Sequence, residues 1–380
     1  MDYDVVVVGG GPVGASLARA ARGPKIAWLA QARRAAQPLP AGAYDSRVYA
    51  LTPGNVAFLE ELGVWRAIPE ARRAPVRAMR VFGDDGASRI EFDAYRAGVP
   101  ALAWIVEDAA LQDALWHGMD ATVAEPEEIR VAEKSVVVKL RDGARLEAGL
   151  VVGADGAKSF VRRAAGIAAR ERDYGQAAVV ANFRCARAHR GVAHQWFQGG
   201  AVLALLPLPA DQVSMVWSLP AAEAARVERL EEGALCREVE AASHGALGGL
   251  ALAAAPRAYP LKRLSAARLV ALRVALVGDA AHVVHPLAGQ GLNLGLQDVR
   301  ELAALLRRCD EGRDPGDVRL LRRYERARAE PILAMNITVD GLFTLFKGES
   351  PALARVRNAG LNLVDRVPVL KNMLIRQAMS

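Results

Sequence analysis

The sequence predicts an α/β fold in which an antiparallel sheet is inserted into a parallel-sheet frame and a helical tail follows. Three observations predict it. The apolar runs Val5–Val8 and Val274–Val277 each end in glycine, as strands buried on both faces of a parallel sheet do. Several short strand-like runs lie between residues 176 and 220. From Leu321 onward the pattern is helical and basic.

The chain begins with a strand–turn–helix–strand unit. Glycines follow Val5–Val8 at once, then come the helical stretch Ala15–Ala20 and the short strand Ile26–Leu29. The middle of the chain differs, because Pro and Asp residues separate its strands, as in an antiparallel sheet. The strands predicted there are Ala178–Phe183, Val202–Leu206 and Val213–Leu219. A further helix is predicted from Gly291 to about Arg308.

Composition excludes several classes of protein. The 380 residues are 52% hydrophobic and 24% charged, so the chain can bury a large core and general disorder is excluded. The net charge is +7, and residues 321–380 hold ten basic against five acidic side chains. No basic run is interleaved with aromatic residues, which disfavours nucleic-acid binding. The three cysteines are far apart and odd in number, which disfavours a disulfide framework or a zinc site.

The N-terminus and the hydropathy pattern bear on location. Asp2 and Asp4 precede an apolar run that ends in glycines, which is typical of a strand and not of a signal peptide. No stretch of about 18 apolar residues is present to span a membrane. We therefore expect a reduced, cytoplasmic protein.

The first motif is a glycine-rich turn between a strand and a helix. Gly9, Gly11 and Gly14 fit GxGxxG, with Pro12 and Val13 as the two residues before the last glycine, and the motif follows a strand and precedes a helix. The first glycine permits the tight turn, the second lets the backbone approach a pyrophosphate, and the third lets helix and strand pack closely. The free N–H groups of the helix N-terminus favour an anion. The motif predicts a dinucleotide site; a purely structural turn is the alternative.

The end of the second strand leaves the dinucleotide open. An acid that binds the ribose hydroxyls is expected about 20 residues after the glycines. Ala30 and Gln31 stand there instead, followed by Arg33 and Arg34. Gln31 can hydrogen-bond a hydroxyl, and the arginines would favour a 2′-phosphate. The first motif alone is thus compatible with FAD, NAD and NADP.

Two later motifs follow strands in the same way. Asp155 lies in an Asp-Gly turn, which alone is a common structural feature. The segment from Arg273 to Asp298 is more specific: a strand, the turn Gly278–Asp279, a glycine-rich loop and a helix start. Asp279 can accept a hydrogen bond from a ribityl hydroxyl. The amides of residues 289–293 can stabilise negative charge on a reduced isoalloxazine ring.

The order of these three motifs resembles the single-component, FAD-dependent aromatic monooxygenases with a p-hydroxybenzoate-hydroxylase-like fold. Within them, HPLAGQGLNLGLQD at residues 285–298 is similar to the signature of the ubiquinone-biosynthesis hydroxylases. The segments Asp45–Leu51, Val192–Pro220 and Tyr259–Leu261 also resemble that family, so the likeness spans roughly residues 3–330.

The resemblance implies a domain organisation. A discontinuous Rossmann-like FAD-binding domain would comprise residues 1–75, 100–175 and 266–335. An antiparallel-sheet substrate domain would comprise residues 76–99 and 176–265. Residues 336–380 would form a C-terminal helical tail.

The resemblance also implies which residues contact FAD. The glycine motif would hold the pyrophosphate, Arg47 would lie near the polar side of the cofactor, and Asp155 would have a structural and pyrophosphate role. Asp279 would hold the ribityl chain. The complete set of expected cofactor-binding residues is Gly9, Gly11, Pro12, Val13, Gly14, Gln31, Arg47, Asp155, Gly278, Asp279, Pro286, Gly289, Gln290, Gly291, Leu292 and Asn293.

In this family NADH or NADPH reduces FAD, and reduced FAD adds O2 to form a C4a-hydroperoxide whose distal OH passes to a phenol ring. The flavin performs the chemistry, so no catalytic triad is expected. His285 and Pro286 would line the flavin loop, and His282 and His285 are interpreted as residues that support it. No third ligand accompanies them, so no metal site is expected.

The inserted sheet would cover the flavin and form the substrate pocket. Weak candidates, which alternate roughly by two, are Trp196, Leu203, Leu205, Met215 and Trp217. For each of them, a place in the sheet core facing a helix layer is an equal alternative. The resemblance implies a prenylated phenol as substrate.

The tail contains Leu363, Val367, Leu370 and Leu374 on one predicted helical face, with basic residues largely off it. Such a helix can lie on an anionic bilayer, at the inner face of the membrane, or dock onto the enzyme itself or a partner in a ubiquinone-biosynthesis complex. Two other functions stay open at this point: the same chemistry on a soluble aromatic substrate, and a non-catalytic subunit of a biosynthetic complex. The sequence does not determine the oligomeric state.

Overall fold

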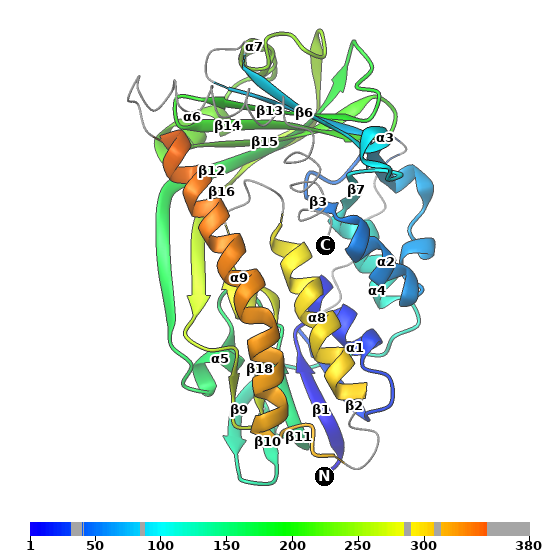
Figure 1. Cartoon of the computed structure of the whole chain (residues 1–380), viewed down its shortest axis with the longest axis vertical. Helices are drawn as coiled ribbons and strands as arrows, with labels where there is room; N and C mark the ends of the chain where they lie inside the picture. Colours follow the sequence, from blue (N-terminus) through cyan, green and yellow to red (C-terminus); the bar gives the residue numbers. More distant parts are fainter. Residues whose placement is uncertain (32–39, 41, 84–87, 285–289, 308–312, 348–380) are drawn as a thin grey trace.

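The computed structural model describes residues 1–31, 40, 42–83, 88–284, 290–307 and 313–347. Within these residues an α/β body and a large antiparallel sheet stack along the long axis of the molecule (Figure 1). The predicted fold class is confirmed, and each predicted strand lies within or closely matches an observed one.

The α/β body is built on a sheet whose central strands are parallel. In the described residues the strand order is β17-β18-β11-β1-β2-β8, and the β9–β10 pair extends from β11. The core strand β1 has Val5, Val6 and Val7 completely buried, which explains its continuous apolar run. The strands are β1 Tyr3–Val8, β2 Ile26–Ala30, β8 Thr122–Val123, β9 Pro126–Val131, β10 Val136–Leu140, β11 Arg145–Gly153, β17 Val270–Ala271 and β18 Val274–Leu276.

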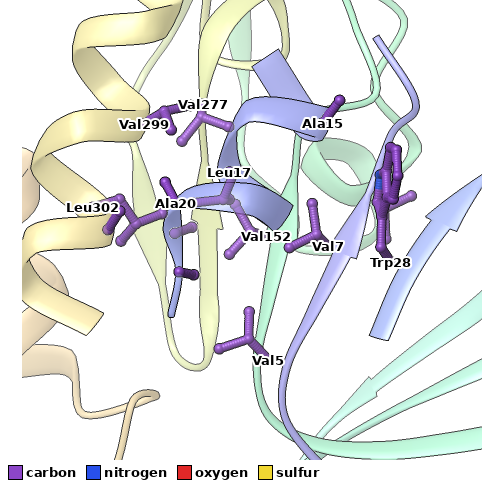
Figure 2. Packing of buried hydrophobic residues seen from close by; sticks show 14 of the residues in the cluster. Val5, Val7, Ala15, Leu17, Ala20, Trp28, Val152, Val277, Val299 and Leu302 are labelled. Atoms are coloured by element: carbon purple, nitrogen blue, oxygen red, sulfur yellow. The ribbon is translucent and has the colours of Figure 1, made fainter. Parts of the chain in front are cut away.

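Helices cover this sheet. Figure 2 shows Leu17 and Ala20 of α1 packed between the sheet and Leu302 of α8, which makes one continuous apolar core. The helices of the body are α1 Pro12–Ala20, α4 Asp108–Trp116, α5 Phe160–Ala164 and α8 Gly291–Arg307.

The second large sheet is mainly antiparallel, in the order β19-β16-β12-β15-β14-β13-β5-β6. Helices α6 (Ala221–Glu228) and α7 (Glu232–Ala242) cover one of its faces. The expected domain boundary between residues 175 and 176 falls inside β12. The strands are β5 Ala78–Phe82, β6 Arg89–Asp93, β12 Ala169–Cys185, β13 Val192–Gln198, β14 Ala201–Leu208, β15 Gln212–Pro220, β16 Leu250–Ala266 and β19 His282–Val283.

A small three-stranded sheet lies beside these two, with strand order β3-β7-β4. It and its neighbours comprise β3 Val48–Leu51, β4 Arg73–Val76, β7 Ala103–Glu107, α2 Pro53–Glu61, α3 Ala94–Ala97 and the 3₁₀ helices Trp65–Ala67 and Glu70–Arg72. A third 3₁₀ helix, Gly278–Ala280, follows β18 in the α/β body.

The long helix α9 (Val318–Lys347) runs beside α8 and reaches the antiparallel sheet (Figure 1). Near its start the buried hydroxyl of Tyr324 donates to the Leu276 carbonyl at 2.8 Å. Near its end Asp340 accepts from Tyr174 Oη at 2.7 Å and pairs with Arg263. The helix is therefore tied to both large sheets.

Candidate active site

The main cavity opens at the carboxyl ends of adjacent parallel strands, where a sheet of this type binds ligands. Its volume is about 820 Å³. Gly9 follows β1, Asp155 follows β11 and Asp279 follows β18, so three motifs that are far apart in sequence meet at one edge of the sheet. Gly11, Pro12, Val13, Gln31, Arg47, Gly291 and Leu292 also line it.

The glycine turn has the geometry that the motif predicts. Gly9 has φ +131°, and a Cβ there would lie 2.1 Å from the Ala154 carbonyl oxygen. A Cβ on Gly14 would lie 2.1 Å from the Gly9 oxygen. At Gly11, by contrast, a Cβ would meet no atom within 4 Å. Gly9 and Gly14 are thus required by packing, whereas Gly11 leaves the cavity free for a ligand.

Asp155 holds the second turn. Its Oδ2 accepts from the Phe160 amide at 2.6 Å and from the Val161 amide at 3.1 Å, which fixes the start of α5. Its Oδ1 is buried and has no hydrogen-bond partner in the part of the chain that the structure describes. The buried Arg162 joins this turn to the next motif, because its guanidinium donates to the Ala280 carbonyl at 2.8 Å. One carboxylate oxygen of Asp155 therefore has a structural role, while the other can accept a hydrogen bond at the cavity wall.

Asp279 projects into the cavity from the third turn. The surrounding protein raises the pKa of its carboxyl, while His282 and Arg47 act to lower it. The preceding residue, Gly278, has φ +60°, and a Cβ there would meet Val13 of α1 at 3.0 Å. Gly278 accordingly serves the packing of the turn and does not line the cavity.

A buried carboxylate fixes the same turn from behind. Asp298 is fully buried and accepts from the Gly278 amide at 2.9 Å and from Arg328 Nε of α9 at 2.7 Å. Its Oδ2 also lies 2.6 Å from His282 Nε2. Burial acts to raise the pKa of Asp298, but His282, Arg328 and the Gly278 amide together hold it below its ordinary value. His282 is 2% exposed, which agrees with a supporting role.

Arg47 and its neighbours form the polar side wall. Its guanidinium lies over the Tyr49 ring, 5.7 Å from the centroid. Tyr49 Oη donates to Asp108 Oδ1 at 2.9 Å, and Gln112 Nε2 donates to the same oxygen at 2.8 Å. Burial raises the pKa of Tyr49, so this phenol stays protonated and donates. This wall therefore presents the positive charge of Arg47 together with an Asp108 carboxylate that two hydrogen bonds hold in place.

A second cavity of about 550 Å³ adjoins the first, because Arg47 and Gln112 line both. Arg257 and Tyr259 of β16 line it from the antiparallel sheet. Its remaining lining residues are Asp45, Ser46 and Asp108. The antiparallel sheet thus faces the site across a polar space.

Several expected cofactor residues lie elsewhere. The side chain of Asn293 joins a buried network: it accepts from the Thr52 amide at 3.0 Å and donates to the Ala50 carbonyl at 2.7 Å. Gly14 and Gly278 pack against backbone and Val13, and Gln290 is half-buried outside the described cavity walls. His285, Pro286 and Gly289 lie outside the described residues.

The expected pocket residues on the antiparallel sheet need correction. They lie in a cluster with Val227 of α6 and Leu235 of α7, and none lines either described cavity. Successive strand residues point to opposite faces, so the large side chains took the helix-covered face. This is the alternative, a sheet core facing a helix layer. The five residues are Trp196, Leu203, Leu205, Met215 and Trp217.

Sequence reasoning missed other cavity residues. Tyr49 lies in the segment Asp45–Leu51 that resembles the family, and Lys158 lies three residues after Asp155, but no pattern in the sequence identifies either as a cavity residue. Glu125 and Arg141, which pair at 3.1 Å, come from stretches with no motif signal. The other missed lining residues include Gln112 and Arg163.

These residues fit a flavin dinucleotide. The turn has a glycine whose Cβ position is open, a helix N-terminus lies at the cavity, and one Asp155 oxygen is unpartnered. Residues 2–336 match the family model described as FAD binding domain. The chain is 33% identical to the ubiquinone hydroxylase UbiL of Rhodospirillum rubrum, over 99% of this chain and 89% of that protein. The chain belongs to this family of FAD-dependent hydroxylases.

Further relatives of the family agree. The 3-demethoxyubiquinol 3-hydroxylase of Escherichia coli is 32% identical, over 99% of this chain and 98% of that protein. Among solved structures, PqsL of Pseudomonas aeruginosa with 2-aminobenzoylacetate has a TM-score of 0.78 at 26% identity, covering 94% of this chain and 99% of its own. HpxO of Klebsiella pneumoniae with FAD and uric acid has a TM-score of 0.77 at 19% identity, covering 98% and 97%, and shows the shared fold.

Proposed function

We propose that this FAD-dependent hydroxylase acts on the aromatic ring of a ubiquinone precursor, a phenol that carries a prenyl chain. Support comes from the relatives, which are named ubiquinone hydroxylases and match nearly the whole chain. The observation that carries the proposal is the convergence of Gly11, Asp155 and Asp279 on one cavity beside the antiparallel sheet. NADPH or NADH would supply the electrons and O2 the transferred oxygen.

Bound FAD supplies the oxygen-transfer chemistry, and the chain's own groups hold and shield it. The α1 N-terminus and Gly11 would bind the pyrophosphate, Asp279 would accept from a ribityl hydroxyl, and Arg47 would place a positive charge at the polar side. Gln31 would meet the adenosine ribose in place of an acid. Gly291 and Leu292 would lie near the isoalloxazine ring, where the amides at the start of α8 would stabilise negative charge on it.

The first experiment measures both cofactor and turnover. The purified protein is mixed with FAD, desalted and examined for the visible bands of oxidised flavin. It then receives NADPH or NADH, ¹⁸O2 and either a prenylated phenol or a soluble benzoate, with products detected by mass spectrometry. We expect bound flavin and one ¹⁸O atom in the prenylated product. If only the benzoate is labelled, the substrate is a soluble aromatic and not the prenylated phenol. A protein that stays colourless would refute the enzyme assignment.

We propose that the substrate ring binds against the face of the antiparallel sheet opposite the large residues. Arg257 and Tyr259 line the second cavity, and their cross-strand partners are Val180 and Ala178. Cross-strand partners share a face, so these strand positions turn toward the cavity side. Their neighbour Val179 is in the helix-facing cluster.

Val180→Trp tests this face. The added ring volume should raise the KM for the phenol by about tenfold or more while FAD stays bound, because the change is on the substrate side only. Trp217→Phe, on the opposite face, is the matched control and should lower stability without changing that KM. Equal KM values for wild type and Val180→Trp would place the substrate elsewhere.

We also propose that the C-terminal part of the chain contacts the membrane that holds a prenylated substrate. Leu333 and Ile337 of α9 lie one helical turn apart and are 59% and 63% exposed. The predicted apolar face at residues 363–374 follows in sequence, with basic residues off it. No helix in the described part of the chain is long and apolar enough to cross a bilayer. These features support a protein that binds at the membrane surface through its C-terminal part.

A further inference from the structure

Two buried tryptophans hydrogen-bond to the glycine turn on the side away from the cavity. Trp28 lies on β2 and Trp116 is the last residue of α4; they are 4% and 7% exposed. Trp28 Nε1 donates to the Gly9 carbonyl at 2.9 Å, and Trp116 Nε1 donates to the Gly10 carbonyl at 3.0 Å. The two rings contact each other, with centroids 4.4 Å apart and a tilt of 49°. Consecutive carbonyls of the turn are thus held by one aromatic pair.

This contact determines which way the peptide groups of the turn point. A peptide unit is planar and trans, so its N–H points opposite to its carbonyl. With the Gly9 and Gly10 carbonyls turned toward the indoles, the amides of Gly10 and Gly11 turn to the other side. The indoles are not among the cavity-lining residues, whereas Gly10 and Gly11 are. A carbonyl dipole turned into the cavity would repel a pyrophosphate, and the indole N–H groups prevent that rotation.

The end of β2 is adapted to this arrangement. A Cβ on Gly10 would lie 2.8 Å from Ala30 Cβ and 2.9 Å from Trp116 Cζ2. Ala30 is 1% exposed, so a small side chain lets Trp116 reach the turn. This is also where an acid for the ribose was expected.

We infer that Trp28 and Trp116 are positioning residues that preset the turn for the FAD pyrophosphate, in a chain whose second strand ends at Ala30 and is followed by Gln31. They act through the backbone and do not touch the cofactor. The preset turn lowers the cost of ordering the backbone when FAD binds, since its amides already face the ligand. The inference rests on FAD as the cofactor.

Trp28→Phe and Trp116→Phe test it, because each keeps a ring and removes the N–H donor. The affinity of the flavin-free protein for FAD and for riboflavin, which has the isoalloxazine but no phosphate, is measured by quenching of flavin fluorescence. Loss of one neutral hydrogen bond corresponds to about 3- to 10-fold in affinity. We expect the Kd for FAD to rise by that factor in each variant and the Kd for riboflavin to stay within twofold of wild type.

Trp65→Phe is the matched control, since Trp65 is a buried tryptophan of the same apolar core whose ring contacts Trp104 and Arg73. It should leave both Kd values unchanged. Gly10→Ala is a second variant, because its added Cβ would push the Trp116 ring away from the turn. It should likewise raise the Kd for FAD but not the Kd for riboflavin.

The outcomes are distinguishable. An unchanged Kd for FAD, or equal losses for FAD and riboflavin, would reduce the tryptophans to ordinary core residues and overturn the inference. Wild-type protein that binds neither compound would overturn the cofactor assignment and the inference with it.

Discussion

His194 shows what burial does to one titratable residue. It is 6% exposed, and its ring is stacked parallel to Phe82 and Trp196 with centroids 6.5 and 5.5 Å away. Among the described residues its buried Nδ1 has no hydrogen-bond partner. Burial, followed by the charge of Arg80, lowers the pKa of His194 from 6.5 to about 4. The native state therefore holds this imidazole neutral.

The protein should lose stability as the pH falls through this range. Between pH 6.5 and about 4 the unfolded chain binds a proton at His194 that the folded chain does not. The His194 contribution is complete above pH 6.5 and is lost toward pH 4, by up to about 3 kcal/mol at 1.4 kcal/mol per pKa unit. Urea denaturation across this range, with His194→Gln as comparison, measures it. A variant with the same pH slope as wild type would contradict the assignment.

Two glycines of the turn should fail in different ways. Gly14→Ala puts a Cβ 2.1 Å from the Gly9 oxygen, so we expect loss of several kcal/mol of stability or no folded protein. Gly11→Ala meets no protein atom, so its melting temperature without FAD should match wild type while the Kd for FAD rises at least tenfold. Thermal denaturation of flavin-free protein and FAD titration separate the two. Parallel losses in both variants would show that Gly11 is also a packing residue.

At the residue scale, the sequence predicted what local backbone geometry dictates. A glycine that local backbone geometry requires leaves a readable motif: Gly9 has φ +131°, and a Cβ on Gly14 would collide with the Gly9 oxygen five residues earlier. Trp28 and Trp116 left none, because they are 88 positions apart and meet only through the fold. Asn293 illustrates a third case: it stands in a strong motif, but its side chain serves the packing of α2 through Asn55.

At the element scale, Asp298 links α8, α9 and the turn after β18. Asp298→Asn removes the charge that compensates the buried Arg328 and its contact with His282. Leaving one partner of a buried pair uncompensated costs about 3–5 kcal/mol. We expect a loss of this size in urea denaturation, together with weaker FAD binding because the Gly278–Asp279 turn loosens. Glu238→Gln, in a surface ion pair with Arg226, is the control and should leave the midpoint nearly unchanged.

For the antiparallel sheet, the sequence pattern predicts the strands but not which face lies toward the cavity. Its strands were predictable from β-branched runs and turn residues. Which face would meet the substrate was not, because β12, β15 and β16 bury apolar residues on both faces: Val179 and Met215 on one, Ala178 and Leu261 on the other. A period of two identifies two faces without assigning them, and only the positions of α6 and α7 decide between them.

At the scale of the whole molecule, the α/β body and the antiparallel sheet are parts of one structure that α9 connects. Removing residues 348–380 keeps both ties of this helix, so the truncated protein should keep its melting temperature and bound FAD. It should lose sedimentation with vesicles that contain anionic lipid, since the basic amphipathic segment is gone. Retained vesicle binding would move the membrane contact to another surface. Full-length protein that ignores vesicles would favour a partner subunit instead.

Pro331 lies within α9, between Arg328 and Asp340, the residues that tie this helix to Asp298 and to Tyr174. A proline has no N–H and clashes with the carbonyl four residues earlier, so a helix bends most easily there. Helix α9 therefore has a point of easy bending between its contacts with the two large sheets. A bend at Pro331 would change the angle between the turn after β18 and the antiparallel sheet while the Asp298–Arg328 ion pair and the Asp340–Tyr174 hydrogen bond stay formed.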